Sequence, residues 1–165
     1  MKPVTEPILL AAANAFDFGG PVVCDGRHYG EGHINDTYLV WRADHSKRFI
    51  LQRINTDTFT DPVGLMENIC GVTRHLSRKI LAEGGDPMRE TLNVVPTLSG
   101  STCYLDAEGG AWRVYDFVEG TVCLQQVGCE ADFRTVAETL GKFQNQLADY
   151  PASTLHETIA RFHDT

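Results

Sequence analysis

The feature that most constrains the fold is a long helical pattern in residues 61–82, which stands between two groups of short strand patterns. Its apolar residues recur at steps of three and four, and Asp61-Pro62 supplies an N-cap followed by a residue favoured at the first helical position. The apolar positions are Val63, Leu65, Met66, Ile69, Val72, Leu76, Ile80 and Leu81. A helix that is apolar along one face must cover another apolar surface, so we expect it to lie across a sheet.

The strands of that sheet are predicted on both sides of the helix. Residues 22–28, 35–43 and 47–54 are strand-like and separated by short polar turns, which indicates an antiparallel meander. Glycine and proline then end the helix, and residues 92–100, 101–109 and 110–120 give shorter strand patterns. The predicted class is α+β, with an antiparallel sheet of about five strands and one long helix.

Three further helices are predicted. Residues 5–16 have apolar residues at helical spacing and Thr5 as an N-cap, and residues 131–149 form a second long helix. A shorter helix is predicted over residues 153–162, with the closing His163, Asp164 and Thr165 as its terminus. The apolar face of the helix at residues 131–149 consists of Phe133, Val136, Leu140, Phe143 and Leu147.

Composition excludes several classes of function. The formal net charge of −8, without a dense cluster of Lys and Arg, argues against a nucleic-acid partner. No segment approaches the roughly 20 consecutive apolar residues that a membrane span needs. The five cysteines are odd in number and form no C-x-x-C pair, so we interpret them as reduced thiols in a cytoplasmic protein. Small-molecule partners are favoured.

A glycine-bearing turn joins the first two predicted strands. The stretch YGEGHINDTYLVW places Gly30 and Gly32 one residue apart, just before a polar turn and an apolar run. Protein kinases carry G-x-G-x-x-G in a loop over the nucleotide phosphates, and here Asn35 replaces the third glycine. The pattern by itself fits either an ordinary hairpin or a phosphate-covering loop.

Several blocks of the sequence together resemble a known group of enzymes. The blocks are GEGHINDTYLV, RFILQRINTDTF, LMENICGVTRHL, GAWRVYDFVEGTV, LGKFQNQLADY and ETIARFHDT. They resemble the aminoglycoside-phosphotransferase-like superfamily, which has a protein-kinase-like fold, and within it the bacterial N-acetylhexosamine 1-kinases, also labelled mucin-desulfatase-like proteins. Such enzymes use ATP and Mg²⁺ to phosphorylate the anomeric hydroxyl of N-acetylglucosamine or N-acetylgalactosamine.

The resemblance implies a division of the chain and a set of loop residues. Residues 1–119 would form the small, nucleotide-facing lobe, and residues 120–165 the connector and the first helices of the large lobe. Gly30, Glu31 and Gly32 would cover the nucleotide phosphates, because backbone N–H groups at glycine can approach a ligand without a Cβ in the way. Asn35 would brace the loop by bonding its own backbone, or be a plain Asx-turn residue. His33 would meet the sugar, or be an exposed imidazole without a partner.

The third predicted strand departs from the protein-kinase pattern. Kinases place a lysine there to hold the α- and β-phosphates, whereas FILQ places Gln52 at that position. Gln52 would contact the nucleotide, or be a strand residue facing a polar cleft. Arg53 alternates to the opposite face and cannot replace the lysine. Glu67 is accordingly expected to be a solvated helix residue rather than half of a Lys–Glu pair.

The last strand pattern, WRVYDFVEG, would run into the connector that holds adenine. In this fold backbone N–H and C=O groups of the connector bind the base between apolar walls, which implies Tyr115, Asp116, Phe117 and Val118 as cofactor-binding residues. Any edge strand that ends at a glycine would fit the same pattern, so this assignment depends on the resemblance.

No catalytic residue or metal ligand is predicted within the chain. Phosphoryl transfer in this superfamily needs an aspartate in an H-N-D-like run and a later acidic motif for Mg²⁺, and neither occurs before Thr165. We therefore expect the chain to be the N-terminal part of a longer kinase and inactive alone, with Mg²⁺ ligands in the large lobe. The exposed apolar face of the helix at residues 131–149 would favour self-association.

Three alternatives stay open. A kinase of the same superfamily acting on homoserine, choline or methylthioribose would keep this lobe. A nucleotide-binding or regulatory module without catalysis would keep it too. The chain could also be an unrelated α+β domain.

Overall fold

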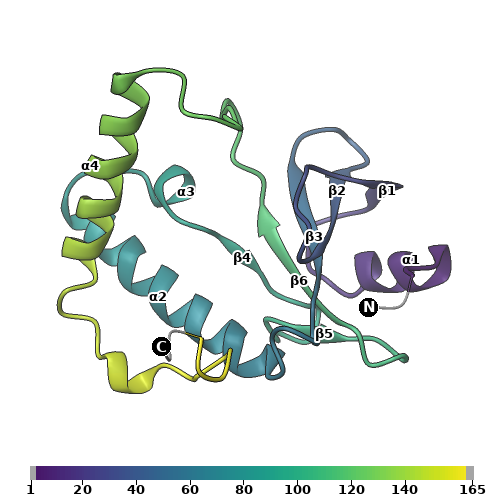
Figure 1. The fold of residues 1–165 in the computed structure, drawn as a ribbon. Coiled ribbons are helices and arrows are strands. Elements are labelled where there is room, and N and C mark those ends of the chain that lie inside the picture. The colour runs from purple at the N-terminus through teal and green to yellow at the C-terminus, as the bar shows by residue number, and fades with distance from the viewer. Residues whose placement is uncertain (1–2, 163–165) are drawn as a thin grey trace.

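A computed structural model describes residues 3–162 of the protein. Within these residues the strands form one six-stranded antiparallel sheet in the order β1-β2-β3-β6-β4, with β5 beside β6 (Figure 1). The strands are β1 (Val22–His28), β2 (Asp36–Arg42), β3 (Arg48–Ile54), β4 (Val94–Val95), β5 (Tyr104–Leu105) and β6 (Ala111–Asp116). The predicted meander is confirmed, while β4 and β5 are shorter than their sequence patterns.

The predicted long helix is α2 (Pro62–Ala82), and the Asp61 side chain caps it by accepting a hydrogen bond of 2.9 Å from the Gly64 N–H. The other helices are α1 (Glu6–Asn14), the short α3 (Pro87–Glu90) and α4 (Glu130–Gln146). Thr5 is the N-cap residue of α1, but its side chain makes no capping bond. Within residues 3–162, no helix combines the length and the apolar character that crossing a bilayer requires.

The larger part of the core lies between α1 and one face of the sheet, which we call the α1 face. Side chains alternate along each strand, so every second residue of β2, β3 and β6 points to this face. Trp112, Leu51 and Val40 are fully buried there. The other buried members of this cluster are Leu9, Ala12, Ala13, Phe16, Phe18, Tyr38, Phe49, Val95 and Val114.

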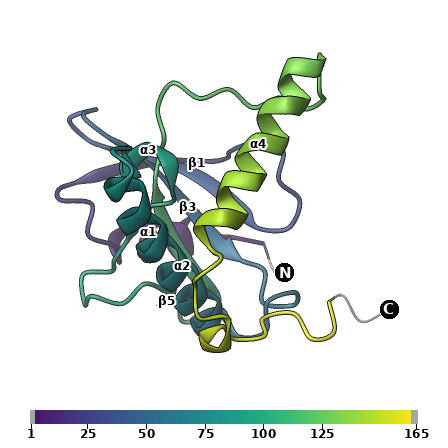
Figure 2. The ribbon, with the colours of Figure 1, turned by 90° about the vertical axis from the view of Figure 1, so that its left-hand side faces the viewer.

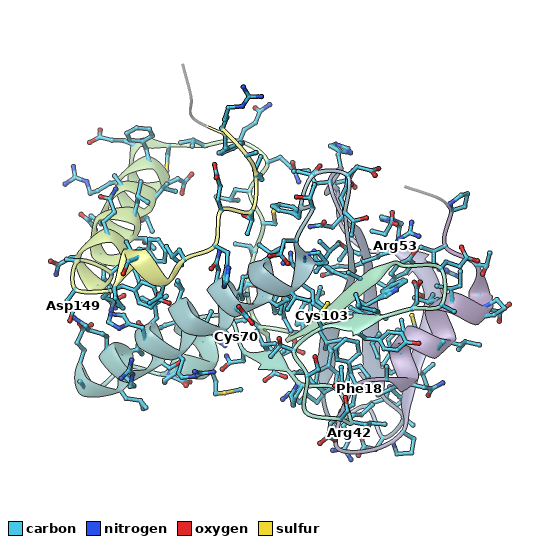
Figure 3. All side chains as sticks on the ribbon, turned by 90° about the horizontal axis from the view of Figure 1, so that it is seen from below. Phe18, Arg42, Arg53, Cys70, Cys103 and Asp149 are labelled. Carbon is cyan, nitrogen blue, oxygen red and sulfur yellow. The ribbon has the colours of Figure 1, made fainter. Side chains whose placement is uncertain are left out.

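Helix α2 covers the opposite face, which we call the α2 face. Met66 of α2 packs with Ile54 and Ala111, which lie opposite each other on β3 and β6. Cys70 and Cys103 pack against the same cluster from α2 and from the segment before β5 (Figure 3). Burial raises the pKa of both thiols, so both stay protonated at neutral pH.

Helix α4 stands apart from the sheet, on the side of α2 (Figure 1), and is nearest the viewer in the turned view (Figure 2). Polar contacts hold its C-terminal end: the His75 ring lies 3.0 Å from the Gln146 carbonyl, and Lys79 pairs with Asp149 at 2.7 Å. Its apolar face is exposed, with Phe133 66% and Leu140 54% accessible. Four of the five predicted apolar residues are therefore exposed, while Leu147 lies just after α4 and is half-buried.

The predicted helix at residues 153–162 is wrong. The structure has only a 3₁₀ turn at Ala152–Thr154, followed by irregular chain. Asn68 of α2 explains the difference, because its side-chain amide donates to the His156 carbonyl (2.9 Å) and accepts from the His156 N–H (2.8 Å). Both backbone groups are thereby withdrawn from helical bonding. The closing residues, His163, Asp164 and Thr165, lie outside the described part.

Candidate functional site

The glycine turn is an open loop between β1 and β2. Gly30 has a φ of +80°, in the left-handed region that glycine tolerates, whereas Gly32 has no such φ. A Cβ added at either glycine would have no atom within 4 Å. Glu31 and His33 are exposed. No side chain therefore stands between the loop backbone and a ligand. Of the two glycines, only Gly30 has a positive φ.

The base of the loop is tied to the sheet by three polar contacts. Asn35 Oδ1 accepts a hydrogen bond of 2.9 Å from the Asn55 N–H, so Asn35 joins the loop to the chain after β3 rather than to its own backbone. Asp36 accepts from Arg53 Nε at 2.9 Å, and the Tyr29 N–H donates to the Thr37 carbonyl at 2.8 Å. These bonds fix where the loop starts and ends.

Gln52 lies on the α2 face in the middle of the sheet, within a row of three side chains. Thr37, Gln52 and Arg113 are directly opposite one another on β2, β3 and β6. Gln52 Nε2 donates to Thr37 Oγ1 (3.0 Å), and Gln52 Oε1 accepts from Arg113 Nε (3.1 Å) and Nη2 (3.0 Å). We call this the Thr37–Gln52–Arg113 row.

Arg53 and Glu67 both point away from this row. Arg53 is 8% exposed and lies on the α1 face, where it pairs with Asp36 and faces the Trp112 ring at 6.0 Å. The Glu67 carboxylate is mostly solvated and lies 2.6 Å from His156 Nε2. Glu67 is therefore exposed, as expected, and in addition its carboxylate contacts the C-terminal segment.

The predicted connector begins at the end of β6 and its side chains diverge. Tyr115 is buried on the α2 face, where burial raises its pKa to about 12 and keeps the phenol neutral. Asp116 turns to the α1 face and pairs with Lys47 at 2.7 Å. The N–H groups of Asp116 and Phe117 donate to Asn93 and Arg48 carbonyls (2.9 and 3.1 Å). Among residues 3–162, the Val118 N–H makes no backbone–backbone hydrogen bond.

Aromatic contacts bring the glycine loop and the connector together. The Tyr29 ring, just before Gly30, meets the Phe117 ring edge-on with centroids 6.0 Å apart. The Arg48 guanidinium also lies over the Phe117 ring, 4.1 Å from its centroid, and Arg48 Nε donates to Glu119 at 2.8 Å. The glycine loop and the connector, which were each predicted to contact the nucleotide, are thus neighbours.

Sequence reasoning missed Tyr29, Arg48 and Arg113. Arg113 had a readable signal, because Ala111, Arg113 and Tyr115 alternate with the apolar residues of the α1 face and must share the α2 face. The contacts of Tyr29 and Arg48 with Phe117 join residues far apart in the chain, and no local pattern signals them.

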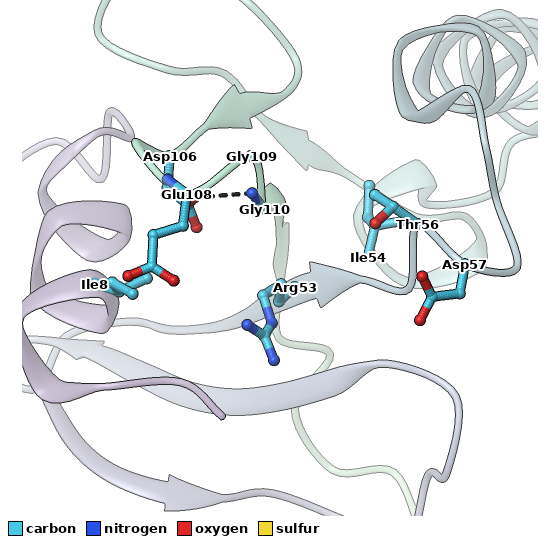
Figure 4. A pocket seen from close by; sticks show the side chains of 9 residues that line it. All are labelled: Ile8, Arg53, Ile54, Thr56, Asp57, Asp106, Glu108, Gly109 and Gly110. Atoms are coloured by element: carbon cyan, nitrogen blue, oxygen red, sulfur yellow. Dashed lines mark hydrogen bonds between the residues drawn. The ribbon is translucent and has the colours of Figure 1, made fainter. Parts of the chain in front are cut away.

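A separate polar cavity of about 190 Å³ lies near the start of β6 (Figure 4). It contains none of the predicted site residues. Its lining residues are Ile8, Arg53, Ile54, Thr56, Asp57, Asp106, Glu108, Gly109 and Gly110. Burial raises the pKa of Asp106, but hydrogen bonds from Trp112, Gly110 and Glu108 outweigh this and hold it below the usual value. Asp106 thus serves as an anchor for the β5–β6 hairpin.

The metal-ligating side chains are scattered across the described residues. Within residues 3–162, no group of three or more His, Cys, Asp or Glu side chains is arranged to hold a metal ion. No step that depends on Mg²⁺ is therefore assigned to these residues. Backbone N–H groups at a glycine loop are donors of the kind that phosphate groups bind.

Comparison with known proteins supports the predicted fold. No protein-family profile matches the chain. The chain is similar to the crystal structure of an aminoglycoside phosphotransferase from Alicyclobacillus acidocaldarius, with a TM-score of 0.59 and 13% identity over 95% of this chain and 39% of that one. It is also similar to a spectinomycin phosphotransferase in complex with ADP and spectinomycin, with a TM-score of 0.52 and 14% identity over 93% and 41%.

These similarities confirm the fold class. The antiparallel sheet with a long helix matches the N-terminal lobe of an aminoglycoside-phosphotransferase-like fold. The chain spans less than half of the length of each of these two proteins, 39% of the first and 41% of the second.

Proposed function

We propose that the chain is the nucleotide-binding part of an ATP-dependent small-molecule phosphotransferase. One observation carries this proposal: in a kinase-like sheet, the open glycine loop and the connector meet through Tyr29 and Phe117. ATP would lie against the α2 face, with its phosphates under Gly30, Glu31 and Gly32 and its base at the backbone of residues 115–118. The ADP complex of the spectinomycin phosphotransferase supports a nucleotide in this fold.

We propose an N-acetylhexosamine as the acceptor, phosphorylated at its anomeric hydroxyl. The resemblance of the sequence blocks to N-acetylhexosamine 1-kinases supports this assignment, and the exposed His33 at the loop tip is the residue that would meet the sugar. The same proposal includes the division of the chain into residues 1–119 and 120–165. It also includes the packing of the exposed α4 face against further protein.

The test is calorimetric titration of the purified chain with ATP and, separately, with adenosine. We expect ATP to bind, and we expect no sugar 1-phosphate when Mg²⁺ and N-acetylglucosamine or N-acetylgalactosamine are added, because the groups that position the acceptor are absent from the described residues. Failure of both ATP and adenosine to bind would contradict the proposed nucleotide site. Sugar 1-phosphate formation would contradict the predicted absence of catalytic residues.

Valine substitutions at the two loop glycines are expected to act differently. Gly32→Val adds bulk where the phosphates would approach, without placing a β-branched residue at positive φ, so it should weaken ATP binding and leave the unfolding midpoint nearly unchanged. Gly30→Val forces valine to a φ of +80° and should also cost about 1–3 kcal/mol of stability. The measurements are ATP titration and urea unfolding.

Gly100→Val is the matched control for this pair. Gly100 has a φ of +83° in the turn after β4, so valine there should lower stability without changing ATP affinity. Unchanged ATP binding by Gly32→Val would mean that the turn is an ordinary hairpin.

His33→Ala in the catalytically active enzyme is expected to weaken sugar binding more than nucleotide binding. Loss of one hydrogen bond should cost about 1–2 kcal/mol, read as a higher KM for the N-acetylhexosamine. His45→Asn removes another exposed imidazole, in the β2–β3 turn, and should change neither constant. An effect of His33→Ala on ATP alone would remove His33 from the sugar site.

A further inference from the structure

The Thr37–Gln52–Arg113 row has a fixed direction. Thr37 Oγ1 accepts from the Gln52 amide nitrogen, so the Gln52 oxygen must face Arg113, and it accepts two N–H groups from that guanidinium. Arg113 is therefore held in one orientation by a neutral partner. Its guanidinium also lies over the Tyr115 ring, 5.0 Å from the centroid, on the connector side of the row.

The surroundings of this guanidinium contain no compensating negative charge. Among the ion pairs of residues 3–162 none involves Arg113, whose side chain bonds Gln52, lies over the Tyr115 ring and is close to the neutral Cys103 thiol. Burial raises the pKa of Tyr115 to about 12, so the phenol carries no charge at neutral pH. Because a partly buried cation is costly without an anionic partner, this position favours binding of an anion.

The guanidinium retains donors for such an anion. Arginine has five N–H donors in a planar fork, and Gln52 accepts two of them. Three remain without an acceptor among the described residues, including both on Nη1. A planar set of N–H donors matches the oxygens of a phosphate group better than those of most neutral ligands.

We propose that Arg113 binds the phosphate groups of the nucleotide and so replaces the lysine that protein kinases carry on the third strand. Gln52 occupies the strand position of that lysine, and the Arg113 guanidinium lies 3.0 Å from the Gln52 amide oxygen on the same face. The cation therefore comes from β6 instead of β3, and Gln52 orients it. This inference rests on the proposed nucleotide site.

The test compares ATP with adenosine, which lacks phosphates, on the purified chain. Arg113→Met should weaken ATP binding about 10- to 100-fold, as expected for loss of one charge-assisted contact, and change adenosine binding less than about twofold. ATP binding by the variant should also depend less on salt concentration, which a purely structural role of Arg113 would not change.

A compensating variant and a control complete the experiment. In Gln52→Lys/Arg113→Met the cation returns to β3, and ATP affinity should recover to within about threefold of the unmodified chain. Arg78→Met removes an exposed arginine from α2 and should leave both affinities unchanged. If Arg113→Met does not fold, Arg113→Lys takes its place in the test. Lysine keeps the charge but loses the planar fork, so this variant should weaken the binding of ATP and leave the binding of adenosine unchanged.

The outcomes separate this inference from the proposed function. If ATP and adenosine bind and Arg113→Met or Arg113→Lys leaves the ATP affinity unchanged, the inference is wrong and the nucleotide site stands. An equal loss of ATP and adenosine affinity would likewise overturn it, because that result indicates a structural role. If the unmodified chain binds neither ligand, both proposals fail together.

Discussion

Replacing Trp112 with alanine is expected to lower the free energy of unfolding by about 3–5 kcal/mol, among the largest effects of any single substitution in the sheet. Trp112 is fully buried on central strand β6, and its ring lies 6.2 Å from that of Tyr38 on β2. Its indole N–H donates to Asp106 Oδ2 at 2.7 Å, so alanine removes both a large apolar side chain and the anchor of the β5–β6 hairpin.

Urea unfolding checks this expectation, and the second tryptophan makes it measurable. The chain has two tryptophans, so Trp41 still reports unfolding by fluorescence when Trp112 is replaced. Trp112→Phe keeps most of the bulk and loses only the N–H, which should cost about 1–3 kcal/mol. Equal losses for alanine and phenylalanine would show that the hydrogen bond, rather than burial, dominates at this position.

Much of the fold could be predicted because its elements follow local rules. The strand pattern of residues 22–28, which ends at the glycine-bearing turn, predicts β1 with the bounds Val22–His28 that the structure shows. Asp61 followed by Pro62 predicted the start of α2, and the capping bond to Gly64 is the physical reason. These signals depend on residues within a few positions of each other, so a single sequence contains them.

The wrong helix at residues 153–162 and the unexpected partner of Asn35 involve contacts between distant parts of the chain. The Asn68 amide binds the backbone of His156, 88 positions away, and this bond replaces the helix that the pattern of residues 153–162 predicts. Asn35 likewise bonds the Asn55 N–H across 20 positions instead of its own loop.

The second large effect is expected at the ion pair that supports the glycine loop. Arg53→Met should lower the free energy of unfolding by about 3 kcal/mol, because it leaves the largely buried Asp36 carboxylate without its guanidinium. The exposed fractions of the two side chains are 9% for Arg53 and 22% for Asp36. His28 lies 3.2 Å from Asp36 and compensates the carboxylate only partly, since its ring is half exposed.

A double-mutant cycle measures the coupling free energy between Arg53 and Asp36 separately from the contribution of each side chain. Arg53→Met/Asp36→Asn should lose less stability than the two single changes summed, with a coupling of about 1–3 kcal/mol, since the double variant leaves no buried charge unpaired. Arg27→Met provides the control, because its pair with Asp25 is 3.8 Å long and Arg27 is 87% exposed, so the change should stay below about 0.5 kcal/mol. Simple additivity would show that Arg53 and Asp36 contribute independently.

The same cycle connects stability to the proposed nucleotide site. Asp36 is the first residue of β2, directly after the loop, so the pair fixes the end of the segment that would cover the phosphates. In Arg53→Met we therefore expect weaker ATP binding even where the chain remains folded, because the loop must be ordered again when ligand binds. Adenosine should be affected less, since it makes no contact through phosphates. Equal affinities for ATP in Arg53→Met and in the unmodified chain would mean that the pair stabilises the sheet without positioning the loop.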